Sequence, residues 1–178
     1  MTDFLQLGRP GRRRAAVVAV ARAIAVIAVF LLGYFTLPVD GFNADNPTAA
    51  WIRLVVVALA FLVVLGVQVR IVVRARAPQI RAAEAVVECV VAFHCLFALL
   101  YLSMSTTDVA AFSEPLDRVD ALYFTASSFA TVGFGDIAPS TRLSRAVVTI
   151  QMLAGLGILM MIAKVTFYAA KQGLRRRR

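Results

Sequence analysis

Four long, predominantly apolar stretches constrain the fold of this chain more than any other feature of its sequence. They cover residues 15–37, 51–73, 89–107 and 146–163, and the last extends to about residue 168. A helix needs about 20 apolar residues to cross a hydrocarbon core of about 30 Å. We therefore expect an all-α membrane protein with four transmembrane helices.

The composition supports this class and excludes others. Hydrophobic residues make up 61% of the chain and charged residues only 16%, against about 25% charged in a soluble domain. The net charge of +9 is typical of basic cytoplasmic loops, so we expect no nucleic-acid partner. A single histidine leaves no set of side chains for a catalytic triad or a zinc site, so we expect no enzyme.

A fifth uncharged run, residues 121–135, has only 15 residues and is too short to span the membrane. It predicts a re-entrant half-helix followed by extended backbone, which is tolerated at membrane depth only in a protein interior or along a water-filled path. Asp117 can cap this helix, with Asp120 as its capping-box partner. Alternatively, both carboxylates simply solvate a loop.

The run ends in Thr-Val-Gly-Phe-Gly-Asp, at residues 131–136. Gly133 and Gly135 can adopt the positive φ that aims successive carbonyls in one direction. Four such segments in a ring can replace the water shell of a potassium ion. Val132 and Phe134 would then point away from the ions and pack behind the backbone. The alternative is an ordinary glycine-rich turn between membrane helices.

Residues 84–168 resemble the pore module of tetrameric potassium channels, which consists of an outer helix, a pore helix, a filter and an inner helix. The resemblance is carried by residues 123–130, the motif at 131–136, and Pro139 before the last apolar run. It implies that K⁺ is the transported ion and that no organic cofactor is needed. The implied filter residues are Thr131, Val132, Gly133, Phe134 and Gly135. The resemblance implies that the carbonyl oxygens of the first four residues bind K⁺, together with the hydroxyl of Thr131.

Three further residues are expected to support the filter. Asp136 ends the motif, and many members of the family hold this aspartate with a tryptophan of the pore helix. Phe124 takes the comparable place here and has no hydrogen-bond donor, and Ser127 stands where some bacterial members have glutamate. We therefore expect Asp136 to be held in a different way.

The last apolar run contains candidate gating residues. Gly155 lies 19 residues after Asp136, at about the depth of the hinge glycine in related inner helices. Gly155 and Gly157 are therefore hinge candidates, and the alternative is that they permit close helix packing. Counting helically from Leu156 places Phe167 on the same face, as a candidate for the inner gate.

Charge placement predicts the topology and the assembly. Basic residues gather at 9–14, 70–81 and 171–178, which places both termini in the cytoplasm of a multi-pass plasma-membrane protein. The bias toward Ala, Val and Arg suggests a bacterial source. One filter per chain requires four chains to close a ring, so we expect a homotetramer. The basic tail is either a topology signal or a site for anionic membrane lipid, at Arg175, Arg176, Arg177 and Arg178.

The sequence thus divides into a basic cytoplasmic N-terminus (1–14), a transmembrane hairpin (15–78), a pore module (79–170) and a basic cytoplasmic tail (171–178). The hairpin lacks the regularly spaced arginines of a voltage sensor. Arg22 lies inside its first apolar run, where it would either pair with Glu84 or Glu88 or extend to the lipid headgroups. His94 is either a neutral, hydrogen-bonded side chain or a proton sensor.

The function that these features favour is passive, K⁺-selective conduction through a central tetrameric pore. Two alternatives remain at this level. One is a subunit of a potassium uptake transporter, although those proteins carry degenerate filters. The other is a non-conducting membrane scaffold or sensor with a channel-like fold.

Overall fold

The computed structural model describes residues 9–36 and 78–175, together with scattered positions between 52 and 70. Side chains are described from residue 17 in the first helix, from residue 83 in the third, and at most positions up to residue 164 in the last. The regular structure is helical: α1 (Arg9–Thr36), α3 (Pro78–Thr107), the 3₁₀ helix η2 (Val109–Ala111), α4 (Arg118–Phe129) and α5 (Arg142–Arg175). Within these residues, β structure is limited to one bridge between Phe112 and Pro139.

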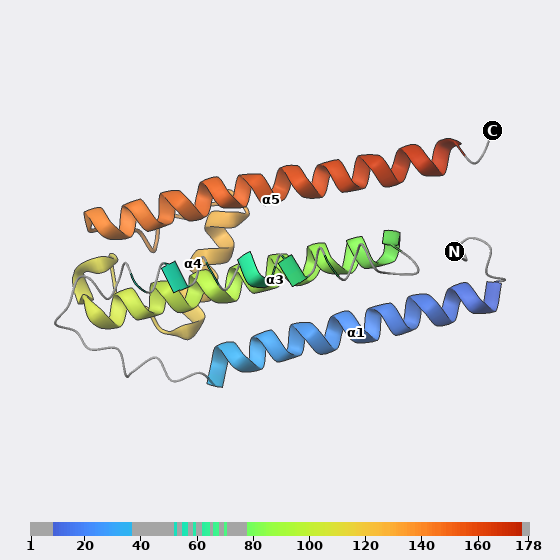
Figure 1. Cartoon of the computed structure of the whole chain (residues 1–178). Coiled ribbons are helices and arrows are strands. Elements are labelled where there is room, and N and C mark those ends of the chain that lie inside the picture. The colour runs from blue at the N-terminus through green and yellow to red at the C-terminus, as the bar shows by residue number, and fades with distance from the viewer. Residues whose placement is uncertain are drawn as a thin grey trace.

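Helix α3 lies between α1 and α5, and the short helix α4 crosses between α3 and α5 (Figure 1). The first residues of α1 and α3 lie at the same end of the molecule as the last residues of α5. Helix η2 lies at the opposite end. This arrangement puts the basic ends of α1, α3 and α5 together, as the charge pattern predicts.

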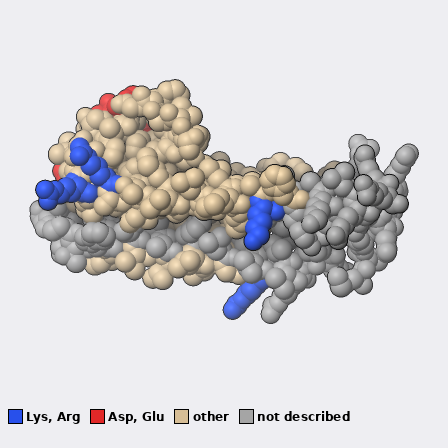
Figure 2. Space-filling view, turned by 90° about the horizontal axis from the view of Figure 1, so that it is seen from above, with Lys and Arg blue, Asp and Glu red and all other residues tan. Residues whose placement is uncertain are grey.

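Three of the described helices are long and apolar enough to cross a membrane: Val17–Thr36, Ala83–Thr107 and Arg142–Lys164. They correspond to the first, third and fourth predicted spans. The second, at 51–73, lies largely outside the described residues, and the positions described there are helical. One face of the molecule carries its charged side chains toward the two ends, with an uncharged stretch between them (Figure 2).

The third span begins earlier than its uncharged run because the protein accommodates two glutamates within the helix. Glu84 and Glu88 are buried, with 7% and 3% of their surface exposed. Glu84 accepts a hydrogen bond from Arg22 Nε at 3.1 Å and forms an ion pair with the same guanidinium. The predicted pairing of Arg22 is therefore confirmed in its Glu84 form.

A second polar contact fixes the C-terminal end of α1. Tyr34 is 1% exposed, and its hydroxyl donates to the carbonyl oxygen of Arg118, the first residue of α4. The guanidinium of Arg118 donates in return to the carbonyl oxygen of Tyr34. Helix α1 is thus attached to α3 at its middle and to the start of α4 near its C-terminal end.

An aromatic cluster joins α3, α4 and the loop between them. The rings of Tyr101, Phe112 and Phe124 lie 5.3 to 5.6 Å apart in edge-to-face pairs, an arrangement that adds to the stabilisation from burial alone. All three side chains are at most 5% exposed. The cluster holds α4 against α3 along the side of α4 that carries Ala121 and Thr125, which are fully buried.

A candidate ion-conducting segment

Helix α4 has the capped start that the sequence predicts. The Asp117 carboxylate accepts hydrogen bonds from the backbone N–H groups of Val119 and Asp120, at 2.6 and 2.8 Å. Asp120 completes the capping box by accepting from the backbone N–H of Asp117 at 3.1 Å. The backbone hydrogen bond from Asp120, followed by that from Val119, lowers the pKa of Asp117. The carboxylate therefore stays ionised at the positive end of the helix dipole.

The length of α4 agrees with a half-helix. Its 12 residues span about 18 Å, less than the hydrocarbon core of about 30 Å. The helix ends at Phe129, and residues 132–134 that follow are neither helix nor strand. The helix therefore ends inside the uncharged run, as predicted, and the extended, re-entrant path stays a prediction.

The backbone after α4 turns at three residues with positive φ. Gly133 and Gly135 have φ values of 55° and 81°, as expected for glycines in such a segment. Thr131 has φ of 58°, which the sequence did not predict and which is unusual for a β-branched residue. The carbonyl oxygen of Ser127 accepts from the N–H groups of Val132 and Gly133, at 3.0 and 3.4 Å. These bonds hold the strained start of the segment against the last turn of α4.

The segment itself is exposed on the isolated chain. All six residues from 131 to 136 are exposed, with Val132 at 54% and Phe134 at 69%. Phe134 stacks on Tyr123 with the ring centroids 6.1 Å apart and the planes within 9°. Phe134 thus has one aromatic partner, Tyr123, whereas Val132 has more than half of its surface exposed. Packing of both side chains behind the backbone stays a prediction.

Tyr123 also holds Asp136, a role that the sequence analysis missed. Its hydroxyl donates to Asp136 Oδ2 at 2.6 Å, and the N–H of Ile137 donates to Oδ1 at 2.9 Å. The bond from Tyr123, more than that from Ile137, lowers the pKa of Asp136, and the same bond raises the pKa of Tyr123. Both groups therefore keep the protonation states that their hydrogen bond requires.

Phe124, which the family tryptophan suggested as a support of Asp136, makes no bond to it in the described structure. Phe124 faces the aromatic cluster, and the donor comes from the residue before it. Helical spacing could have indicated this, because Tyr123 does not lie on the face of α4 that buries Ala121, Phe124 and Thr125. Its hydroxyl is therefore available to a partner outside the core. Ser127 donates from its hydroxyl to the carbonyl oxygen of Phe124 at 3.1 Å, and it reaches the 131–136 segment through its own carbonyl.

A second missed residue, Ser113, fixes the chain beyond the segment. Its hydroxyl accepts from the N–H of Ala138 at 3.0 Å and donates to the carbonyl oxygen of Asp136 at 3.3 Å. Its own N–H donates to the carbonyl oxygen of Ala138 at 2.8 Å. The loop after α3 therefore binds the residues that follow the segment, next to the bridge between Phe112 and Pro139.

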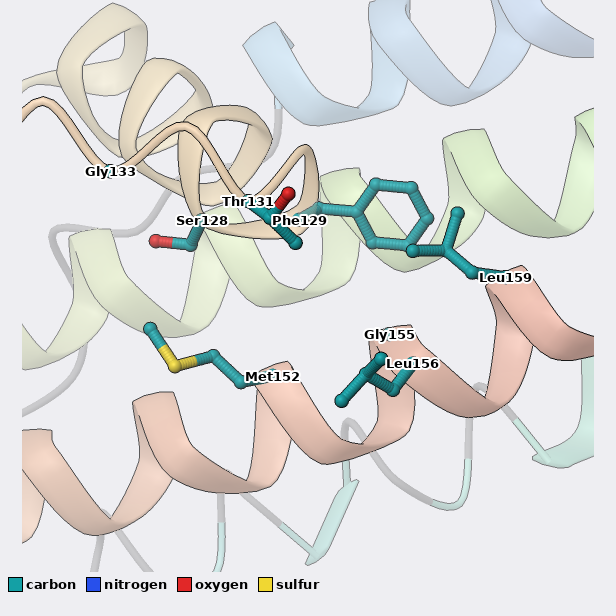
Figure 3. A pocket seen from close by; sticks show the side chains of 8 residues that line it. All are labelled: Ser128, Phe129, Thr131, Gly133, Met152, Gly155, Leu156 and Leu159. Atoms are coloured by element: carbon teal, nitrogen blue, oxygen red, sulfur yellow. The ribbon is translucent and has the colours of Figure 1, made fainter.

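Below the segment, a cavity of about 340 Å³ lies between the end of α4 and α5. Ser128, Phe129 and Thr131 border it from above in Figure 3, and Met152, Gly155 and Leu156 border it from α5. Gly133 and Leu159 complete the lining. The end of α4 and the turn after it therefore line one side of the cavity, and apolar side chains of α5 line the other.

The gating candidates lie on α5. A Cβ atom added to Gly155 would lie 3.1 Å from Cδ2 of Phe129, whereas one added to Gly157 would meet nothing within 4 Å. The close-packing alternative therefore has a contact to support it at Gly155, and the hinge stays a prediction for both glycines. Phe167 is 77% exposed on the isolated chain. Residues 176–178 of the basic tail lie outside the described residues.

Comparison with known proteins agrees with this geometry. Residues 88–171 match the family model described as "Ion channel". A calcium-gated potassium channel, TvoK of Thermoplasma volcanium, is 36% identical over 59 residues, which are 33% of this chain and 17% of that protein. The match thus covers about a sixth of the relative's length. No solved structure matches the chain.

Proposed function

We propose that this chain, whose residues 88–171 match the "Ion channel" family model, forms a K⁺-selective channel. The observation that carries the proposal is the backbone at residues 131–136. Positive φ at Gly133 and Gly135 fits carbonyls that are aimed in one direction, and the hydrogen bond between Tyr123 and Asp136 holds the far end. K⁺ would exchange its water shell for the carbonyl oxygens of Thr131, Val132, Gly133 and Phe134.

Four copies of the chain form the pore in this proposal. Each chain has one such segment, and on the isolated chain the segment is exposed. A row of carbonyls from one chain cannot surround an ion, whereas a fourfold ring supplies four carbonyls at each level. The exposure of large apolar side chains on α5, such as Leu153 at 65% and Met160 at 66%, supports contact with neighbouring copies or lipid.

Helix α4 contributes to conduction through its direction. Its capped N-terminus lies toward η2, and its C-terminus leads into the turn beside the cavity. The negative end of the helix dipole then faces the path that an ion takes below the filter. The central cavity would therefore favour cations without any acidic side chain in it.

The proposed orientation places the protein in the plasma membrane with both termini in the cytoplasm. The basic ends of α1, α3 and α5 lie together, and the filter entrance then faces outward. The last basic residues would lie at the inner surface, where each contributes about 1 kcal/mol to binding anionic lipid.

The test is ion flux in liposomes that contain the purified protein. We expect K⁺ flux well above Na⁺ flux in the parent. Gly133→Asp should abolish the flux or its selectivity, because it adds a side chain and a charge at a φ of 55°. Equal K⁺ and Na⁺ flux in the parent would contradict the selectivity and favour a non-selective channel. No flux across a range of voltage and pH would contradict conduction and favour a scaffold role.

A further inference from the structure

A buried chain of hydrogen bonds links three helices close to the candidate filter. Gln151 of α5 donates from Nε2 to the carbonyl oxygen of Thr125 in α4, at 3.0 Å. Its Oε1 accepts from the hydroxyl of Tyr101 in α3. All three residues are fully buried, with 0% of their surface exposed. Polar side chains inside membrane helices are costly, and they commonly mark functional positions.

The chemistry of the three groups fixes the orientation of the Gln151 amide. The Thr125 carbonyl can only accept, so the NH₂ group must face it, and the Tyr101 hydroxyl then donates to Oε1. The Thr125 hydroxyl does not compete, because it donates to the carbonyl oxygen of Ala121 at 2.8 Å. An apolar residue at 151 would leave the buried Tyr101 hydroxyl without this partner. A buried hydroxyl that loses its hydrogen bond destabilises the fold more than an apolar side chain at the same place would.

The position of the bonded carbonyl connects this chain to the filter backbone. Thr125 lies one turn before the end of α4 at Phe129. Two residues later, the carbonyl oxygen of Ser127 accepts from the N–H groups of Val132 and Gly133. The carbonyl that Gln151 holds and the carbonyl that holds the filter segment therefore belong to the same turn of α4.

Gln151 also divides α5 into two parts. It lies one turn before Gly155, where the ring of Phe129 approaches the α5 backbone. The outer part of α5 is thus bonded to α4, whereas the described residues from Leu159 to Lys164 are exposed except for Ile162. A bend of α5 beyond Gly155 would move the inner part without breaking the bond to Thr125.

We propose that Gln151 is a positioning residue that fixes the inner helix to the pore helix and so sets the geometry of the backbone at residues 131–134. The inference rests on the proposed function, because the geometry matters for selecting K⁺. It assigns no contact between Gln151 and the ion. The amide acts through the last turn of α4.

The test compares Gln151→Leu, which keeps a similar volume and removes the donor to Thr125, with Val148→Ala as a matched control. Val148 is on the same helix and is 3% exposed, so its truncation weakens packing and leaves the hydrogen bonds intact. Two quantities are measured in reconstituted protein: the K⁺/Na⁺ permeability ratio, and the hydrogen-exchange rate of the amides at residues 132 and 133. A third variant, Tyr101→Phe, keeps the bond to Thr125 and removes only the bond that orients the amide.

We expect Gln151→Leu to lower the permeability ratio about three- to tenfold and to raise the exchange rate by a similar factor, as for loss of one hydrogen bond. Val148→Ala should lower thermal stability and leave both quantities at the parental level. Tyr101→Phe should give a permeability ratio and an exchange rate between those of Gln151→Leu and Val148→Ala. If Gln151→Leu does not assemble, Gln151→Met is measured by the same criteria.

A parental permeability ratio and exchange rate in the Gln151 variant would overturn the inference, as would equal losses in Val148→Ala at equal destabilisation. Absence of K⁺ selectivity in the parent would refute the proposed function instead. The exchange measurement would then still decide whether Gln151 holds the 131–134 backbone, because it does not depend on conduction.

Discussion

Tyr123 and Asp136 join α4 to the end of the proposed filter segment, residues 131–136, through one hydrogen bond of 2.6 Å. Both groups are exposed on the isolated chain, and the phenol ring also stacks on Phe134. One side chain therefore supports the segment at two of its residues. Loss of the hydroxyl should affect only the bond to Asp136, since the ring of phenylalanine can still stack.

The first prediction concerns the titration of Asp136. Because its pKa lies below the usual 3.8, the carboxylate stabilises the fold above that pH, and this contribution is lost as the pH falls through the lowered pKa. Tyr123→Phe removes the largest cause of the lowering and should move the Asp136 pKa upward, toward 3.8. Site-specific NMR of the carboxyl carbon measures both midpoints. An unchanged midpoint would show that the hydroxyl does not hold Asp136 in the assembled protein.

Among the elements, α1 has the least obvious role, and its two polar contacts suggest one. At the middle of α1, Arg22 pairs with Glu84 of α3. Near the C-terminal end of α1, Tyr34 exchanges hydrogen bonds with Arg118 at the start of α4. Helix α1 therefore braces the outer helix and the first turn of the pore helix together.

The second prediction tests the inner contact of this brace. Arg22 is 38% exposed at its side chain and Glu84 only 7%, so Arg22→Ala leaves a carboxylate buried without the arginine. We expect a loss of about 2 kcal/mol in unfolding free energy, between the values for exposed and fully buried pairs. Glu84→Gln in the same chain should recover part of it. Thermal unfolding of the four proteins of this double-mutant cycle gives the coupling, and additive losses would contradict the pairing.

The third prediction separates packing from bending at the glycines of α5. Alanine in place of Gly157 should stabilise the helix by up to about 1 kcal/mol, because its Cβ meets nothing within 4 Å. At Gly155 the same gain is opposed by the Phe129 ring, 3.1 Å from the added Cβ. Melting temperatures of Gly155→Ala and Gly157→Ala should therefore differ, with Gly155→Ala lower. Equal shifts would show that the Phe129 contact yields easily.

A difference in flux between these two variants addresses the hinge. If Gly155 bends during opening, Gly155→Ala should reduce the open fraction, whereas Gly157→Ala should not. Equal open fractions in both variants and the parent would leave packing as the role of Gly155.

Elements set by local sequence were predictable, and those set by tertiary contacts were not. The cap at Asp117 and Asp120, the short α4 and the positive φ at the two filter glycines depend on residues within a few positions of one another. The Tyr123 partner of Asp136 required knowing which face of α4 turns toward the core. Gln151 carried no signal, since a lone amide in an apolar run does not reveal that Tyr101 and a carbonyl of α4 lie beside it.

At the scale of the whole molecule, the filter segment and the face of α5 below it remain uncovered on one chain. Residues 131–136 are exposed, and so are Leu153, Leu156 and Met160 of α5. A segment with positive φ at three residues, one of them the β-branched Thr131, would gain further support if neighbouring chains covered it. The account therefore depends on assembly more than on any feature of the single chain.

The fourth prediction is that the protein in mild detergent has four times the mass of one chain, by light scattering corrected for detergent. Leu153→Asp places a charge on the exposed face of α5 and should shift the protein toward smaller species. Leu32→Asn, on an α1 position that is 64% exposed, provides a control away from α5. A monomer in the parent at all concentrations would contradict the assembly.

The central claim is that four copies of residues 131–134 bind dehydrated K⁺, and locating the ions tests it most directly. A structure of the assembled protein would be determined in K⁺ and again in Na⁺. We expect a fourfold assembly with a row of K⁺ ions on its axis, each surrounded by backbone oxygens of residues from Thr131 to Phe134. In Na⁺, the positions of the ions in this row should differ. An assembly in which this segment lies away from the axis, or holds no ions in K⁺, would contradict it.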